Sequence, residues 1–151
     1  MKNKWMIPLL FVLLLISFFL GGNLPAEEIL PEDTSSMEKE EIYSTREEVA
    51  GYLHAYKELP PNFITKKEAQ ARGWVASQGN LWEIAPGKSI GGDSFGNREG
   101  LLPEKAGRKW YECDIDYQGG KRGAKRIVFS NDGLIYYTED HYKSFTEIHF
   151  E

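Results

Sequence analysis

The sequence contains a single cysteine, Cys113, among its 151 residues. No disulfide can form within one chain, so the folded part must be stabilised by its own apolar core. Aromatic residues make up 13% of the chain, which suits that requirement. We expect Cys113 itself to be a small core residue.

Histidine is also scarce, with only His54, His141 and His149 in the chain. A metal site needs several His, Cys or carboxylate ligands that converge on one ion. The three histidines are far apart in the sequence, and we interpret His54 and His149 as surface or packing residues. We therefore expect no metal and no cofactor.

An excess of positive charge is missing as well, since the net charge is -5. Residues 1–45 hold three of the 18 basic and seven of the 23 acidic side chains, so residues 46–151 are nearly neutral. The net charge of the domain therefore does not indicate a nucleic-acid partner. If one exists, the basic residues must be concentrated on one face.

The N-terminus carries the only long apolar run, Trp5–Leu20, after a basic start. Its 16 residues lie between a signal-peptide core and a membrane span of about 20 residues. We expect residues 1–26 to be a signal peptide and the product to be secreted, and an uncleaved anchor stays open. Residues 27–45 are predicted to be an acidic linker or pro-segment. Residues 46–151 are then the folded domain.

Two Thr/Glu capping boxes predict helices, Thr45 with Glu48 and Thr65 with Glu68. The first helix should stop before residues 60–61, which are both proline, and the second at Gly73. A third short turn is expected at 81–85. Alternation then predicts strands at 109–117, 126–130, 134–138 and 144–150. The fold class is α+β, with N-terminal helices packed on a C-terminal antiparallel β-sheet.

Lys66 and Lys67 occupy the first turn of the second predicted helix. The helix dipole favours negative charge at this end, so two ammonium groups are unfavourable there unless an anion binds. We interpret Lys66 as a ligand of a phosphate and Lys67 as a solvated side chain.

The segment Gly91–Gly100 contains four glycines together with Phe95, Arg98 and Glu99. This composition indicates a loop with unusual dihedrals or a close approach to a ligand. A bare backbone beside a ring and a carboxylate suits a flat polar ligand such as a nucleobase. The alternative is a tight surface turn.

Four polar residues lie in the predicted strands or in the segments that connect them: Glu112, Arg122, Arg126 and His141. A carboxylate can take a proton, an imidazolium can give one, and guanidinium groups can stabilise a charged phosphorus centre. Spacing alone equally allows a cross-strand ion pair between Glu112 and Arg126. We expect Asp114 to pair with Arg122 or Arg126 in a structural role.

Residues 46–151 resemble the barnase-type bacterial guanyl-specific ribonucleases along essentially the whole domain. Long blocks match in order and spacing, among them Gly73–Ser77, Ala85–Asp93, Asn97–Gly100, Leu134–Tyr136 and Asp140–Tyr142. The resemblance implies the microbial ribonuclease fold and an endoribonuclease whose substrate is RNA. It implies transesterification to a 2′,3′-cyclic phosphate, followed by hydrolysis to a 3′-phosphate.

The resemblance also implies site residues. Glu112 matches the general base and His141 the general acid, while Lys66, Arg122 and Arg126 match the groups that hold the phosphoryl centre. The guanine site would comprise Gly96, Asn97, Arg98, Glu99 and Tyr142. Glu99 would accept from guanine N1–H and N2–H₂, backbone N–H groups near Asn97 and Arg98 would donate to O6, and Tyr142 would stack on the base.

This chain departs from the family pattern at three places. Gly96 stands where relatives have serine, and Gly133 where close relatives have tryptophan. Segment 119–125, which contains Arg122, is richer in glycine and in basic residues than the usual segment of this family.

The resemblance further implies a monomer that is blocked by a small acidic intracellular inhibitor of the barstar type, with no stable membrane partner once the signal is removed. Two other functions stay open on the sequence. One is a membrane-tethered ribonuclease toxin of the same fold, and the other is a non-catalytic RNA-binding module.

Overall fold

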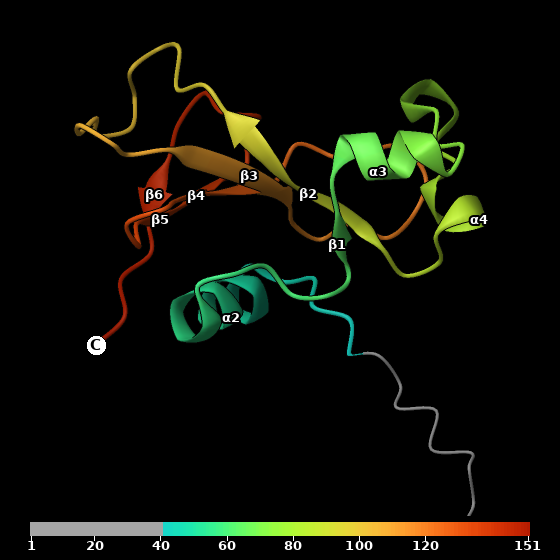
Figure 1. Cartoon of the computed structure of the whole chain (residues 1–151), viewed down its shortest axis with the longest axis horizontal. Helices are drawn as coiled ribbons and strands as arrows, with labels where there is room; N and C mark the ends of the chain where they lie inside the picture. The colour runs from blue at the N-terminus through green and yellow to red at the C-terminus, as the bar shows by residue number, and fades with distance from the viewer. Residues whose placement is uncertain (1–40) are drawn as a thin grey trace, which may run out of the picture. The chain divides into compact units, whose positions relative to one another are not determined.

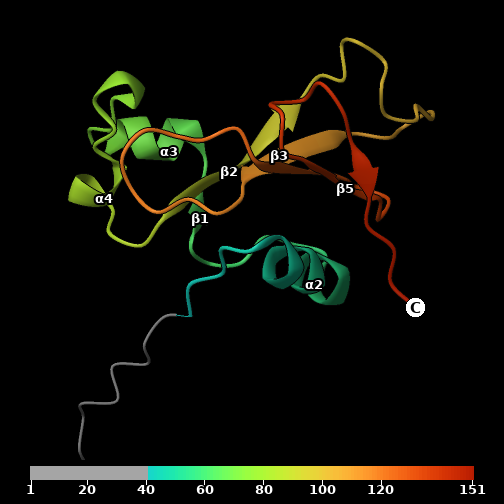
Figure 2. The ribbon, with the colours of Figure 1, turned by 180° about the vertical axis from the view of Figure 1, so that it is seen from behind.

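The computed structural model describes residues 41–151 (Figures 1 and 2). The predicted signal peptide and most of the acidic segment lie outside the described residues. In the described part, none of the helices is long and apolar enough to cross a membrane.

Helix α2 (Arg46–Tyr56) begins at the predicted capping box. The Thr45 hydroxyl accepts from Glu48 N at 3.2 Å, and the Glu48 carboxylate accepts from Thr45 N at 3.1 Å. Two of the unpaired N–H groups at the helix start are thereby satisfied. The helix ends at Lys57, whose left-handed backbone (φ 60°) lets its N–H bond to Leu53 O.

Helix α3 (Lys66–Ala71) is shorter and retains only half of its predicted box, because Thr65 accepts from Glu68 N without a reciprocal bond. It is followed by a 3₁₀ turn, η1 (Ala76–Gln78), which the sequence analysis did not predict. Helix α4 (Leu81–Ile84) confirms the expected short turn before residue 86.

Six strands form one sheet in sequential order (Figure 1). All neighbours are antiparallel except the first pair, which is parallel. The strands are β1 (Phe63–Ile64), β2 (Ser89–Phe95), β3 (Trp110–Asp114), β4 (Arg126–Ser130), β5 (Ile135–Thr138) and β6 (Thr146–Glu147). The α+β prediction is confirmed, although β1 and β2 were not predicted and the last strand is shorter than expected.

Strand β2 corrects the interpretation of Gly91–Gly100 as one loop, since its first half is paired with β3. A Cβ at Gly91 would lie 2.6 Å from Phe63 Cδ1 and 2.7 Å from Cys113 Cβ. Glycine is therefore required there by the close packing of β2 against its neighbours rather than by a turn.

The two faces of the sheet carry different side chains, as the alternation predicted. Val49, Ala50 and Leu53 of α2 pack with Cys113, Ile115, Ile127 and Ile135 in one core. Figure 1 shows α2 beneath β3–β5, with α3 and α4 near the β1 end of the sheet. The opposite face of β3 and β4 carries Glu112, Asp114 and Arg126, and the candidate site is built there.

Candidate active site

A pocket of about 520 Å³ lies on the face of the sheet that α2 leaves uncovered. The segment after β2, strand β3 and the turn after β5 enclose it. Eight of the ten predicted site residues line it: Lys66, Gly96, Asn97, Arg98, Glu99, Glu112, His141 and Tyr142. The fold thus joins residues that are up to 76 positions apart in the sequence.

Glu112 projects from the middle of β3 and is only 8% exposed. Its Oε2 accepts a hydrogen bond from the Tyr142 hydroxyl at 2.7 Å. Its Oε1 lies 3.4 Å from Lys66 Nζ, a long contact that leaves the ammonium free to approach another anion. The carboxylate is thus held on one side and remains accessible on the other.

Lys66 is positioned by Asp93, whose carboxylate accepts from the Lys66 backbone N–H at 3.0 Å. Asp93 is the register partner of Glu112 across the β2–β3 pair. The start of α3 is therefore anchored beside Glu112. The phosphate expected at Lys66 stays a prediction, and in the structure the negative group beside its ammonium is the Glu112 carboxylate.

Tyr142 connects Glu112 to the guanidinium of Arg126, whose Nε lies 3.1 Å from the tyrosine oxygen. Burial, reinforced by the hydrogen bond to Glu112, raises the pKa of Tyr142. The phenol therefore stays protonated and donates to the carboxylate. Its ring stacks on Phe95, with ring centres 5.1 Å apart, so Phe95 packs against Tyr142.

Asp114 pairs with both arginines and confirms the predicted structural role. It accepts from Arg122 at 2.6 and 2.8 Å and lies 3.1 Å from Arg126 Nε. Burial alone would lower the pKa of Arg122, but the bonds and charge of Asp114 raise it. The Arg122 guanidinium therefore remains charged at physiological pH.

The alternative pairing of Glu112 with Arg126 is wrong, since residues 41–151 show no such ion pair. The register of β3 and β4 explains this, because it places Arg126 opposite Asp114 and Val128 opposite Glu112. Neither Arg122 nor Arg126 lines the pocket: Arg122 is bound to Asp114, and Arg126 is joined to the pocket by its hydrogen bond to Tyr142. The glycine-rich segment of Arg122 has a steric reason, since a Cβ at Gly119 would lie 2.8 Å from the Trp82 ring.

His141 lies at the mouth of the pocket in a turn where its own φ is 56° and that of Tyr142 is 72°. Asp140 organises this turn by accepting from the hydroxyl of Thr138 and from the backbone N–H and hydroxyl of Ser144. The Ser144 bonds, with those of its neighbours, lower the pKa of Asp140 to about 2. The strained backbone of His141 is held by this carboxylate.

The side chain of Asn97 faces inward, which limits its expected role. Its amide donates to Leu102 O at 2.9 Å and accepts from Leu102 N at 3.0 Å, and it also contacts Glu104. The residue is 7% exposed, with φ 44°. Only the backbone of Asn97 is therefore available to a ligand, whereas Arg98 and Glu99 have exposed side chains at the pocket.

The other histidines and the cysteine lie away from this pocket. His54 stacks on Phe150 with ring centres 4.2 Å apart, and His149 lies 3.4 Å from Glu147. Cys113 is buried, and burial raises the pKa of its thiol. Across residues 41–151, no group of three or more His, Cys, Asp or Glu side chains could hold a metal ion.

Comparison with known proteins identifies the family. Residues 46–149 match a family described as ribonuclease. A ribonuclease of Heyndrickxia coagulans is 59% identical over 107 residues, which cover 71% of this chain and 98% of that protein. The chain belongs to the ribonuclease family. A ribonuclease of Bacillus intermedius is 57% identical over 115 residues, 76% of this chain and 71% of the relative.

A more distant relative of this ribonuclease is the guanyl-specific ribonuclease St of Saccharopolyspora erythraea. It is 46% identical over 55 residues, which cover 36% of this chain and 54% of that protein. Membership of the family confirms the predicted enzyme class, an endoribonuclease that acts on RNA.

Sequence reasoning missed several residues that line the pocket of this ribonuclease: Ser94, Leu101, Lys143 and Phe145. It also missed the contact of Asp93 with Lys66. The role of Asp93 depends on its place in strand β2, and the glycines of this segment are typical of a loop rather than a strand. The cation of Lys143 could have been found from its position two residues after His141.

Proposed function

We propose that this ribonuclease cleaves RNA after guanosine, without a metal ion, by transesterification and then hydrolysis. The observation that carries the proposal is the single pocket that contains Glu112, His141, Lys66 and the 96–99 segment. A carboxylate and an imidazole in one pocket can move the two protons that phosphodiester cleavage requires.

In the first step, Glu112 takes the proton of the ribose 2′-hydroxyl, and the 2′-oxygen attacks phosphorus. The bond to the 5′-oxygen breaks, and His141 gives that oxygen a proton. The product is a 2′,3′-cyclic phosphate. In the second step the roles are exchanged: His141 takes a proton from water, the water oxygen attacks phosphorus, the bond between phosphorus and the 2′-oxygen breaks, and Glu112 returns its proton to the 2′-oxygen. RNA is required because DNA has no 2′-hydroxyl.

The hydrogen bonds of Glu112 suit this role. Tyr142 holds Oε2 at 2.7 Å, which leaves Oε1 facing the pocket beside Lys66 at 3.4 Å. Negative charge grows on the phosphoryl oxygens as the 2′-oxygen attacks. Positive groups already fixed in place stabilise that charge without reorganisation. Lys66 supplies positive charge at the pocket itself. Arg126, which is 3% exposed, supplies positive charge from behind Tyr142.

Guanine recognition is assigned to the segment after β2. The exposed Glu99 carboxylate can accept from N1–H and N2–H₂ of guanine together. Adenine presents an acceptor at N1 and no amino group at C2, so it would leave the carboxylate unpaired. The buried Asn97 amide fixes the loop, and in the proposal backbone N–H groups near Asn97 and Arg98 donate to O6. The guanyl-specific name of one relative agrees with this assignment.

Tyr142 is the predicted guanine contact that we reassign in part. One side of its ring packs on Phe95, and its hydroxyl is committed to Glu112. Its main role in the proposal is to hold the general base, and stacking on a base would use the other side of the ring.

Secretion, the signal peptide at 1–26 and the acidic linker at 27–45 remain part of the proposal, as do the monomeric state and a barstar-type inhibitor. Complementary charge would guide such an inhibitor to the cationic pocket. Mass spectrometry of the mature N-terminus separates a cleaved, secreted product from a membrane-tethered toxin. If an acidic inhibitor of this type failed to block the activity, the prediction of this partner would be wrong.

The cleavage itself is tested with the dinucleotide GpU and the purified protein in EDTA. The proposal expects guanosine 2′,3′-cyclic phosphate first and guanosine 3′-phosphate later, with ApU cut more slowly. Activity that requires an added metal would contradict it. Binding of RNA without cleavage would favour the non-catalytic module instead.

A further inference from the structure

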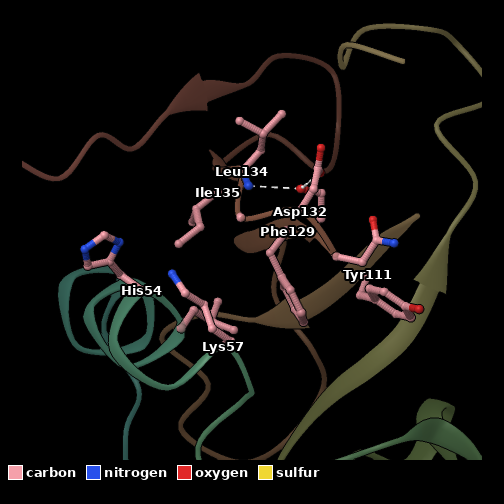
Figure 3. A pocket seen from close by; sticks show the side chains of 11 residues that line it. His54, Lys57, Tyr111, Phe129, Asp132, Leu134 and Ile135 are labelled. Atoms are coloured by element: carbon pink, nitrogen blue, oxygen red, sulfur yellow. Dashed lines mark hydrogen bonds between the residues drawn. The ribbon is translucent and has the colours of Figure 1, made fainter. Parts of the chain in front are cut away.

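A second pocket, of about 490 Å³, lies between the end of α2 and the β4–β5 hairpin (Figure 3). Tyr111 and Phe129 line it from β3 and β4. They alternate along their strands with Glu112 and Val128, so this pocket occupies the opposite face of the sheet from the candidate active site. Its volume is typical of small-molecule sites, which span about 300–1,000 Å³.

The floor of this second pocket is formed by aliphatic side chains and two aromatic rings. Leu53 and Ile135 are 4% and 5% exposed, and the half-buried rings of Tyr111 and Phe129 stand side by side with centres 5.8 Å apart and a tilt of 30°. At the hairpin turn Gly133 (φ 96°) contributes no side chain, and even a Cβ at this position would meet nothing within 4 Å. A planar ring can therefore lie against the two aromatic side chains.

The polar groups of the hairpin are already satisfied by the protein. Asp132 accepts three bonds of 2.8–2.9 Å from Arg108 and another of 2.5 Å from the Ser130 hydroxyl. The Asn131 amide accepts from one backbone N–H at 2.8 Å and donates to one backbone carbonyl at 3.0 Å. This side of the pocket therefore offers a ligand neither a free negative charge nor an open amide.

The helix side of the pocket offers positive charge. Figure 3 shows the nitrogen of Lys57 reaching from the end of α2 toward Ile135, with His54 beside it. Lys57 forms no ion pair with any residue in 41–151. The carbonyl end of α2 carries about half a negative charge, which the full charge of Lys57 outweighs. His54 is fixed by its stack on Phe150.

We propose that this second pocket binds a planar aromatic anion, with its ring against Tyr111 and Phe129 and its anionic group at Lys57 Nζ. Two sources share this chemistry. One is a free aromatic carboxylic acid, and the other is a nucleotide of RNA that lies outside the cleavage pocket. The inference does not depend on the proposed cleavage mechanism, since the two pockets share no residue.

The experiment titrates indole-3-carboxylate into the purified protein and follows the NMR signals of Tyr111 and Phe129. Saturable shifts at these rings are expected. Lys57→Gln should weaken binding about tenfold or more, the equivalent of one charge-assisted hydrogen bond. The uncharged indole-3-carboxamide should bind more weakly and with equal affinity to both forms.

Lys67→Gln is the matched control, because it removes another exposed lysine from a helix outside the pocket and should leave binding unchanged. Thermal unfolding of Lys57→Gln shows whether the variant is folded, and its cleavage of the dinucleotide GpU should equal that of the original protein. Absence of saturable shifts at millimolar ligand would overturn the proposal. The proposal would also be overturned if indole-3-carboxylate and the carboxamide bound with the same affinity and Lys57→Gln left that affinity unchanged.

Cytidine 5′-monophosphate distinguishes the two sources in the same assay. Shifts at Tyr111 and Phe129 with this nucleotide, weakened by Lys57→Gln, would identify RNA as the source. Shifts with the indole acid alone would identify a free aromatic acid. Shifts confined to the Glu112 pocket for both ligands would refute the second site.

Discussion

Asp114 should be the most important single carboxylate for stability, and Asp114→Asn tests this. The Asp114 side chain is 2% exposed and binds two guanidinium groups, of which Arg126 is 4% and Arg122 is 19% exposed. Removal of one partner from a buried ion pair leaves uncompensated charge and costs about 3–5 kcal/mol. The amide is nearly isosteric, so the loss measures charge rather than packing.

A matched control lies two residues further along the chain. Asp116 pairs with Lys125 at 3.2 Å, but the two side chains are 39% and 49% exposed. Exposed pairs contribute about 1 kcal/mol or less, so Asp116→Asn should have a small effect. Asp116 has φ 57°, a conformation that asparagine tolerates, so the control adds no backbone strain.

The assays are urea unfolding and thermal unfolding at pH 7, each followed by circular dichroism and tryptophan fluorescence. For a domain of this size, each kcal/mol shifts Tm by about 4–8 °C, so Asp114→Asn should melt at least about 12 °C below the original protein. The m-value should not change. Equal losses for Asp114→Asn and Asp116→Asn would refute the reasoning, because burial would then not determine the strength of the pair.

Three further predictions follow from the site and its supports. Glu99→Gln should lower the preference for GpU over ApU by about 5–150-fold, the value of one bidentate base contact, with an unchanged preference contradicting the assignment. Asp140, with a pKa of about 2 from its Ser144 bonds, should stabilise the fold fully above the unfolded value of about 3.9 and lose that contribution as the pH falls toward 2. Acid unfolding of Asp140→Asn should therefore change less between pH 4 and 2 than that of the original protein, and identical acid curves would exclude this role. Gly91→Ala should cost about 1–3 kcal/mol, because its Cβ has no room. Gly123→Ala, whose Cβ meets nothing within 4 Å, should stay within about 0.5 kcal/mol in the same urea assay.

Features that depend on a few adjacent residues could be predicted from the sequence. The Thr45 capping box and the start of α2 are examples, because the bonds join residues only three apart. The opposite faces of β3 follow from alternation in the same way, so Cys113 could be assigned to the core and Glu112 to the polar face.

Features that depend on register or on close packing could not be predicted. Gly91 lies in a segment whose composition is typical of a loop. Only the close approach of Phe63 and Cys113 explains why a strand has glycine at this position. Arg126 pairs with Asp114 and not with Glu112, and this could be predicted only from the register of β3 and β4. The eight pocket residues could be named in advance because long blocks resemble a known family, not because their spacing required it.

The central claim is that Glu112 is the general base and His141 the general acid, and the nature of the leaving group tests it most directly. Guanosine 3′-(4-nitrophenyl phosphate) releases a phenolate that needs no proton, whereas GpU releases an alkoxide that does. With GpU, Glu112→Ala and His141→Ala should each lose about 10²–10⁴-fold in kcat. With the nitrophenyl ester, Glu112→Ala should lose as much as before, while His141→Ala should retain nearly full activity. An equal loss for His141→Ala on both substrates would contradict its assignment as the acid.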